Sequence, residues 1–518
     1  MEMHPQRWGD PALAAPLPDA TRGLVDMAIG TADVPAADRV SLPAPGLPAG
    51  LLDSLRGVLG ADAVLVDDET RRLRTRGKST TDLLRARSGD LGDAPDAVVR
   101  PRGHDEVAAV LAWAVAHHVA VVPFGGGTSV VGGLVACGKD YAGVVSLDLL
   151  RMDQLLAVDE VSMIATFQPG VRGPAAEALL AKHGLTLGHY PQSFEFASIG
   201  GFAATRSSGQ SSCGNGRFDD MVVGLRVATP VGELRLGSAP ASAAGPDLRE
   251  AVLGSEGALG VITEVTVRVR PAAAAKAYEA WTFPSFTAGA EAVRALVQRE
   301  LRPTVLRLSD EAETFVNLAS QTSVGAGQVS GCLMIAGYEG SAALERRPLI
   351  AAALGELGGT PLGEQRGQEW ASGRFAAPYL RDAMLDAGVL VETLETATFW
   401  SHRDRLYQAV KSALEEALGK RTLVLCHISH VYETGCALYF TVATRQAADP
   451  VAQWLAAKAK ASDAILRCGA TITHHHGVGT DHKPWLAQEI GPVGVAMLRG
   501  LKSALDPSGI LNPGVLIP

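Results

Sequence analysis

Residues 121–133 read Val-Val-Pro-Phe-Gly-Gly-Gly-Thr-Ser-Val-Val-Gly-Gly, an apolar run that breaks into a glycine-dense turn. The apolar run predicts a buried strand. Glycines 125–127 have no Cβ, so the backbone there can adopt positive φ and direct its N–H groups at one anion. Thr128 and Ser129 add hydroxyl donors. The stretch predicts a cradle for a diphosphate, although an ordinary glycine-rich turn after a strand fits the same residues.

Two common nucleotide fingerprints do not fit this loop. A Walker loop needs a Lys-Ser/Thr pair after the glycines, and a dinucleotide fold needs GxGxxG spacing at the start of a helix. Neither pattern occurs at residues 125–133. We therefore expect the cradle to belong to another nucleotide-binding fold.

Composition places the chain among globular proteins. Its 518 residues are 47% hydrophobic and 19% charged, and this length predicts two domains with room to bury a large cofactor. The formal net charge is −9. Because no basic stripe stands out, nucleic acid is not an expected partner.

The cysteines and the apolar segments indicate a compartment. Six cysteines are scattered without CxxC spacing, which suits a reducing cytoplasm. The most hydrophobic helix candidate, 107–116, is too short to span a bilayer, and no secretory segment precedes it. We expect a cytoplasmic protein, and the sequence leaves peripheral contact with a membrane open.

Strand and helix patterns alternate through the first half and define the expected domains. Strands are expected at 96–101, 119–124 and 143–148, helices at 104–118 and 174–183, a hairpin at 221–236, and a strand that ends at Pro271. The whole is an α+β fold. Its expected parts are an extended Pro/Ala-rich arm (1–50), a ligand-binding domain (51–275), a second α+β domain (276–460) and a C-terminal segment that returns to the first domain (461–518).

Four further segments are unusually polar for their setting. They are 188–209 (GHYPQSFEFASIGGFAATRSSG), 254–264 (GSEGALGVITE), 379–396 (YLRD and ETLET) and 473–479 (THHHGVG). With the glycine loop and Arg7-Trp8-Gly9-Asp10, these segments resemble, in order, the FAD-binding family related to vanillyl-alcohol oxidase. The triple histidine and the YLRD and ETLET motifs narrow the resemblance to its alkyldihydroxyacetonephosphate synthase branch.

The resemblance implies a two-subdomain PCMH-type FAD-binding domain, a cap domain over the flavin ring, and a C-terminal segment that completes the flavin site. The glycine loop has no His or Cys, so we expect FAD without a covalent bond. Cys213 is the nearby thiol that could form such a bond. The expected cofactor-binding residues are Pro123, Phe124, Gly125, Gly126, Gly127, Thr128, Ser129, Pro191, Ser198, Gly200, Gly201, Thr205, Ser208, Gly209, Glu256, Gly257, Gly260, Val261, Ile262 and His474.

The reaction implied by the resemblance exchanges the acyl group of an acyl-dihydroxyacetone phosphate for a long-chain alcohol, through an adduct at flavin N5. The partners would be these two lipid substrates, and we expect a homodimer. The main alternative is an FAD-dependent dehydrogenase or oxidase of a 2-hydroxy acid such as lactate or glycolate, which shares the cradle and an anion-binding arginine. A flavin binder without activity is a further alternative.

The resemblance also assigns catalytic residues. Tyr439 matches the family's active-site tyrosine, an acid/base that needs neighbours to lower its pKa, and His475 and His476 would supply that field. A half-buried strand tyrosine fits the same pattern. Consecutive strand residues point to opposite faces, so only His474 and His476 could share a metal, and no metal is expected.

Four more residues match positions that the family uses. Arg381 matches an arginine tied to activity and would bind a substrate phosphate, although an ion pair with a neighbouring aspartate fits as well. Arg307 lies in an apolar strand and must be paired or functional. His189 matches an active-site histidine, with a loop histidine bonded to backbone as the alternative. Thr393 keeps a hydroxyl where the family has a serine near the substrate.

Overall fold

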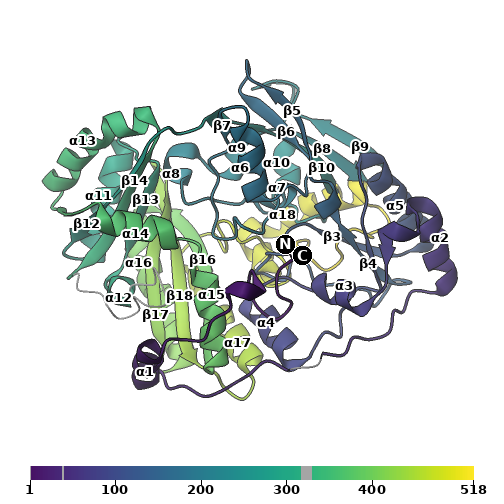
Figure 1. Cartoon of the computed structure of the whole chain (residues 1–518), viewed down its shortest axis with the longest axis horizontal. Helices are drawn as coiled ribbons and strands as arrows, with labels where there is room; N and C mark the ends of the chain where they lie inside the picture. Colours follow the sequence, from purple (N-terminus) through teal and green to yellow (C-terminus); the bar gives the residue numbers. More distant parts are fainter. Residues whose placement is uncertain (1, 38–39, 317–329) are drawn as a thin grey trace.

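The glycine loop follows the edge strand of a small, mainly parallel sheet. The structure is a computed structural model that describes residues 2–37, 40–316 and 330–518 (Figure 1). This four-stranded sheet has the order β1-β2-β4-β3, with β1 at Val64–Leu65, β2 at Ala97–Val99, β3 at Ala120–Phe124 and β4 at Val144–Asp148. β2, β4 and β3 are parallel and apolar, as buried parallel strands require.

A second, antiparallel sheet lies in the same half of the chain. Its order is β5-β6-β10-β8-β9, with β5 at Leu155–Asp159, β6 at Ile164–Phe167, β8 at Val222–Thr229, β9 at Gly232–Leu236 and β10 at Val261–Arg268. β8 and β9 form the predicted hairpin. The short strands β7 (Leu185–Thr186) and β11 (Arg270–Pro271) pair beside this sheet.

The third sheet is seven-stranded, and its paired strands are antiparallel. Its order is β15-β12-β14-β13-β17-β18-β16, with β12 at Lys276–Phe283, β13 at Val305–Ser309, β14 at Cys332–Glu339, β15 at Thr360–Gly363, β16 at Val389–Phe399, β17 at Leu423–Val431 and β18 at Gly435–Arg445. The register sets Tyr439 of β18 between Glu395 of β16 and His427 of β17.

Helices cover these sheets. In the first half they are α2 (Ala49–Leu59), α3 (Asp68–Leu73), α4 (Thr80–Ser88), α5 (His104–His117), α6 (Gly173–Ala181), α7 (Ile199–Thr205), α8 (Ser212–Asn215), α9 (Phe218–Met221) and α10 (Arg249–Val252). Later helices are α11 (Phe286–Gln298), α12 (Glu311–Val316), α13 (Ser341–Glu356), α14 (Gln365–Gly373), α15 (Ala377–Asp386), α16 (Arg403–Leu418), α17 (Pro450–Arg467) and α18 (Lys483–Leu505). None of the helices in the described ranges is both long and apolar enough to cross a membrane.

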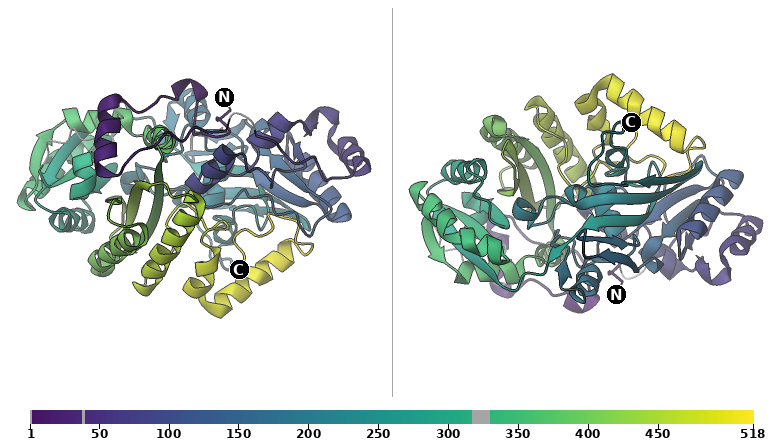
Figure 2. Two further views of the ribbon diagram at one scale, coloured as in Figure 1. Left: turned by 90° about the horizontal axis from the view of Figure 1, so that it is seen from below. Right: turned by 90° about the horizontal axis from the view of Figure 1, so that it is seen from above.

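Both ends of the chain pack against distant elements (Figure 2). After α18, Leu511 forms a parallel bridge with Val121 of β3, and Ile510 and Leu511 enter the core of the first sheet. The N-terminal arm is not extended throughout, because Asp19–Ala28 forms helix α1. An apolar face of α1 packs against helix α15 and against strand β16, which belongs to the third sheet. The arm thus reaches the second half of the chain at α1 and then returns to the first half, where α2 begins (Figure 1).

Candidate active site

The described residues enclose a cavity of about 650 Å³, within the range of small-molecule sites. Its walls come from the glycine loop, from the segments 188–209 and 254–264, and from the inner face of the third sheet. Most of the predicted cofactor residues line it: Pro123, Gly125, Gly126, Gly127, Thr128, Ser129, Pro191, Ser198, Gly200, Gly201, Thr205, Ser208, Glu256, Gly257, Gly260, Val261 and Ile262. Phe124, Gly209, His474 and Cys213 are not part of its lining.

The glycine loop is packed so closely that side chains would not fit. A Cβ at Gly126 would overlap the Phe196 carbonyl oxygen, and one at Gly125 would overlap the Ser198 hydroxyl. Ser198 caps helix α7, where its Oγ accepts from the Gly201 N–H at 3.3 Å. The loop and the start of α7 therefore bring main-chain N–H groups to one side of the cavity, as a diphosphate requires.

Glu256 connects the segment 254–264, in which it lies, to the segment 473–479 and, through Asn512, to the glycine loop. The backbone of Glu256 has φ +49°. The Glu256 carboxylate accepts hydrogen bonds from the N–H groups of Val478 and Gly479 at 2.9 and 2.8 Å. Burial raises the pKa of Glu256 to about 7. Asn512 Nδ2 donates to the carbonyls of Glu256 and Gly133 at 2.6 and 3.0 Å. The C-terminal segment is thereby attached to the cofactor side of the cavity.

Glu395 organises the histidine loop, residues 473–476. Its buried carboxylate accepts from the Thr473 hydroxyl at 2.6 Å and from the main-chain N–H groups of the three histidines at 2.7, 3.0 and 2.9 Å. Burial alone would raise the pKa of Glu395, but the histidines and the Thr473 hydroxyl hold this pKa well below its ordinary value. One carboxylate thus fixes the backbone that carries His475 and His476.

Tyr439 lies between these histidines and β17, but its ionisation differs from the expectation. The Tyr439 ring is edge-on to His476, with centroids 5.6 Å apart, and stacks on His427 at 4.9 Å. Burial raises the pKa of Tyr439 to about 12, and burial lowers the pKa of His475 and brings that of His476 to about 3. The expected lowering of the tyrosine pKa was wrong, because neutral imidazoles exert no cationic field.

The two predicted arginines have different surroundings. Arg307 lines the cavity, donates to Glu313 Oε1 at 2.5 Å and lies 3.0 Å from both ring nitrogens of His427. Arg381 also lines the cavity, and its Nη2 is buried without a partner among the described atoms. An unpaired guanidinium nitrogen in a cavity is suited to an anionic ligand.

Thr393 and His189 lie at different distances from the cavity. Thr393 lines the cavity, and a hydrogen bond with Thr393 partly offsets the rise in the pKa of Tyr439. His189 is 1% exposed and lies behind the lining, where its Nε2 contacts the Ser207 Oγ at 3.1 Å. Ser207 does line the cavity. His189 is therefore placed to act through Ser207.

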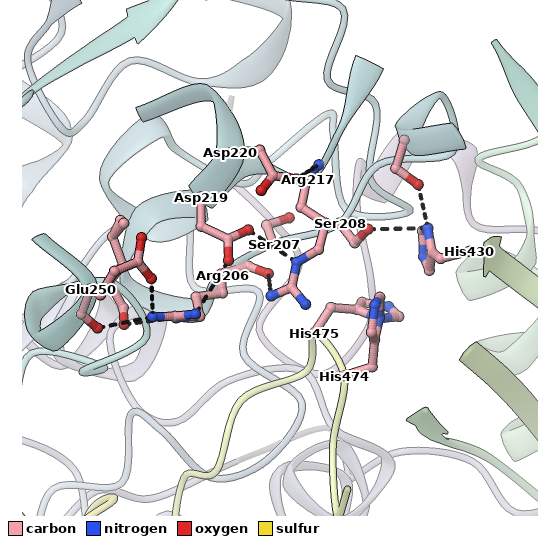
Figure 3. Close-up of polar contacts among 12 residues, drawn as sticks. Arg206, Ser207, Ser208, Arg217, Asp219, Asp220, Glu250, His430, His474 and His475 are labelled. Carbon is pink, nitrogen blue, oxygen red and sulfur yellow. Dashed lines mark hydrogen bonds and ion pairs between the residues drawn. The ribbon is translucent and has the colours of Figure 1, made fainter. Parts of the chain in front are cut away.

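The histidine loop does not obey strand geometry, so the expectation that only His474 and His476 could meet at one point was wrong. Ring nitrogens of His430, His474 and His475 lie within 4.8 Å of one another. His430 Nδ1 contacts the hydroxyls of Ser208 and Ser212 at 3.1 and 2.6 Å (Figure 3). The neighbouring Arg217 guanidinium adds to burial in lowering the pKa of these histidines, and its charge disfavours a cation.

Several site residues were not predicted from the sequence. Glu313 and His427 hold Arg307, His430 joins the histidines, and Trp8 of the arm lines the cavity. Glu395 lies in the ETLET motif, where a carboxylate among apolar strand residues was a usable signal. Trp8 lies in the quoted stretch Arg7-Trp8-Gly9-Asp10, whereas Glu313, His427 and His430 lacked a comparable local pattern.

Comparisons with known proteins agree with this geometry. Residues 95–237 match the model of the FAD binding domain, and residues 272–516 that of the C-terminal domain of FAD linked oxidases. The chain is 34% identical to alkyldihydroxyacetonephosphate synthase of Trypanosoma brucei brucei over 92% of this chain and 82% of that protein. It is 35% identical to the synthase of Dictyostelium discoideum, over 88% and 78%.

A solved structure of alkyldihydroxyacetonephosphate synthase superimposes with a TM-score of 0.84 at 29% identity, covering 99% of both chains. The glycine loop, the start of α7 and the long cavity fit FAD, which is the cofactor that the matched domains bind. The chain therefore belongs to the alkyldihydroxyacetonephosphate synthase family and uses FAD.

Proposed function

We propose that this enzyme exchanges the acyl group of an acyl-dihydroxyacetone phosphate for a long-chain alcohol and so forms an ether lipid precursor. The observation that carries the proposal is that Tyr439, His475 and His476 line the same cavity as Arg381 and the glycine loop. In the overall reaction, the bond from the head-group carbon to the carboxylate breaks and a bond to the alcohol oxygen forms. The alcohol proton is released, with no net redox change.

The chain's residues have separate roles in this proposal. Arg381 Nη2 binds the substrate phosphate, because it is a buried donor without another partner. The neutral imidazole of His476 accepts a proton from the head-group carbon and returns a proton to that carbon as the bond to the alcohol oxygen forms. The phenol of Tyr439 donates a hydrogen bond to the departing carboxylate. Arg307, held by Glu313 and His427, stabilises negative charge near the flavin.

FAD, when bound, supplies an electrophilic ring for the carbon that loses its acyl group. The residues proposed to hold FAD are those that line the cavity in the glycine loop and in the segments 188–209 and 254–264. His474, Phe124 and Gly209 would support this lining from behind.

Anaerobic mixing separates this function from its alternatives. Acyl-dihydroxyacetone phosphate should bleach the flavin absorbance, and fatty alcohol should then restore the oxidised spectrum. A 2-hydroxy-acid dehydrogenase would instead yield reduced flavin with lactate or glycolate. No spectral change with any of these compounds would indicate a flavin binder without activity.

Substrates of this kind partition into lipid, and the mouth of the cavity supports peripheral membrane contact. Leu24 of α1 lines the cavity yet is 42% exposed, and Met27 beside it is 75% exposed. Flotation with phospholipid vesicles tests the contact, which Met27→Asp should weaken. Analytical ultracentrifugation tests the proposed homodimer.

A further inference from the structure

The arm segment, residues 2–10, packs between Lys78 of the first half of the chain and helix α15. Trp8 lines the cavity, is 5% exposed and meets the Phe196 ring edge-on at 5.8 Å. Phe196 belongs to the cofactor segment 188–209, and Met3 and Tyr379 complete the apolar cluster. The arm segment therefore contacts both the cofactor side and helix α15 of the substrate side.

Main-chain hydrogen bonds attach the arm segment to α15. The Trp8 N–H donates to Asp382 Oδ2 at 2.5 Å, and the Asp10 N–H donates to the Tyr379 hydroxyl at 3.2 Å. Gly9 lies between them with φ +71°, and a Cβ there would overlap that hydroxyl. This position requires glycine for both its φ and its space.

Arg381 shares its anchors with the arm segment. Its Nε lies 3.4 Å from Asp382 Oδ1, and its Nη1 donates to the Lys78 carbonyl at 2.8 Å. Lys78 Nζ donates to the His4 carbonyl at 2.5 Å, and the Lys78 N–H donates to the Ser129 carbonyl of the glycine loop at 2.7 Å. Asp382 and Lys78, whose oxygens orient the guanidinium, are thus residues that also form hydrogen bonds with the arm segment.

From these contacts we propose that the arm segment is part of the site that binds the substrate's anionic head group. It positions Arg381 through Asp382 and Lys78, so that Nη2 is directed to the phosphate, and Trp8 encloses the cavity. The inference rests on the proposed function, in which Arg381 binds that phosphate. A guanidinium already held by two acceptors loses less freedom when its ligand binds.

Gly9→Ala tests this role, with Gly23→Ala as its matched control. Gly9→Ala should displace the arm segment, whereas a Cβ at Gly23 in α1 meets no atom within 4 Å. Inorganic phosphate is the probe, used as a competitive inhibitor of alkyl transfer. We expect Gly9→Ala to raise both the KM for acyl-dihydroxyacetone phosphate and the inhibition constant of phosphate about tenfold. Gly9→Ala should keep the wild-type KM for alcohol and the wild-type FAD content, and Gly23→Ala should keep the wild-type values of all these kinetic constants and of the FAD content.

Asp382→Asn provides a second variant, because it keeps the shape of the side chain but weakens its contacts with both Trp8 and Arg381. It should also raise the KM for acyl-dihydroxyacetone phosphate and the inhibition constant of phosphate. Wild-type phosphate inhibition in both variants would overturn the proposal. Equal loss of FAD and phosphate binding in Gly9→Ala would also overturn it, because the arm would then support the fold as a whole. If the wild-type enzyme transfers no alkyl group, the proposed function fails instead.

Discussion

At the scale of single residues, burial decides the ionisation of the catalytic group. Tyr439 enters the cavity as a phenol because its pKa is raised to about 12, and His476 is a neutral imidazole because burial lowers its pKa to about 3. The motif identified these side chains, but their protonation depends on how deeply the third sheet and the histidine loop bury them. A neutral imidazole can accept a proton and a phenol can donate a hydrogen bond, which are the roles proposed for His476 and Tyr439.

Tyr439→Phe tests this assignment. Removing the hydroxyl should lower the rate of alkyl transfer about 100-fold or more, the usual cost of losing one hydrogen-bond donor to a developing negative charge, while FAD stays bound. Tyr278→Phe is the control, since the Tyr278 hydroxyl contacts Glu339 at 2.5 Å and Tyr278 is not among the cavity-lining residues. Initial rates of ether formation measure both variants, and a Tyr439→Phe rate within twofold of the wild type would contradict the role.

Glu256 predicts a pH dependence of stability. Its folded-state pKa of about 7 exceeds the value of 4.5 that an unperturbed carboxyl has, so the folded protein binds this proton more tightly. The resulting stabilisation, about 3 kcal/mol, is present below about pH 4.5 and is lost as the pH rises through 7.

Glu256→Gln should therefore show a smaller decrease of Tm between about pH 5 and 8 than the wild type, because the amide does not titrate. Differential scanning calorimetry at several pH values measures the difference. Glu345→Gln, which changes an exposed glutamate, is the control, and its Tm should follow the wild-type dependence on pH. Parallel curves for Glu256→Gln and the wild type would show that Glu256 does not titrate in this range.

At the scale of elements, the strand register of the third sheet sets three residues of the site in one row. β16, β18 and β17 place Glu395, Tyr439 and His427 side by side, although 12 to 44 positions separate them in sequence. The strands at 119–124 and 143–148 and the hairpin at 221–236 were predictable from apolar runs and turn residues. The register was not, because it depends on which apolar faces pack together.

The histidine loop shows why local patterns misled at this scale. Residues 473–476 were treated as a strand, yet their N–H groups donate to Glu395 and not to a neighbouring strand. The buried Glu395 carboxylate, on a strand distant in sequence, accepts the hydrogen bonds that the carbonyl groups of a neighbouring strand would otherwise accept. This arrangement places His474 and His475 together with His430, which strand alternation would have separated.

Glu395→Gln tests the support of this loop. The amide offers one acceptor oxygen and turns its NH2 toward N–H donors, so we expect a loss of about 2–4 kcal/mol of stability. The rate of alkyl transfer should fall about 100-fold because His475 and His476 lose their fixed position. Thr473→Ser keeps the hydroxyl donor and is the control. Chemical denaturation and initial rates measure the effects, and a wild-type rate in Glu395→Gln would refute the proposed support.

At the scale of the whole molecule, the cavity exists because distant parts of the chain return to it. The glycine loop predicted a diphosphate cradle, the family resemblance predicted FAD, and most of the predicted cofactor residues do line the cavity. Neither predicted that Asn512 would bond the carbonyls of Gly133 and Glu256 or that Trp8 would line the site. These contacts between distant parts of the chain form through tertiary packing. The sequences of the segments concerned carry no periodic pattern that would predict them.

Asn512→Ala tests the C-terminal closure. It removes two buried hydrogen bonds and leaves two carbonyl oxygens without that donor, so we expect a loss of about 2–4 kcal/mol of stability and weaker retention of FAD. Ser508→Ala is the control, because its hydroxyl makes one long contact, 3.3 Å, with Asp506. Thermal unfolding and the flavin-to-protein absorbance ratio after gel filtration measure both. Unchanged flavin retention in Asn512→Ala would contradict the closure.

At this scale, the product of the reaction is the most direct test of the proposed function. The purified flavoprotein, incubated without oxygen with palmitoyl-dihydroxyacetone phosphate and hexadecanol, should release palmitate and form the hexadecyl ether in equal amounts, as measured by mass spectrometry. The flavin should be oxidised at the end of the reaction. Absence of the ether, together with flavin reduction by a 2-hydroxy acid, would contradict the account.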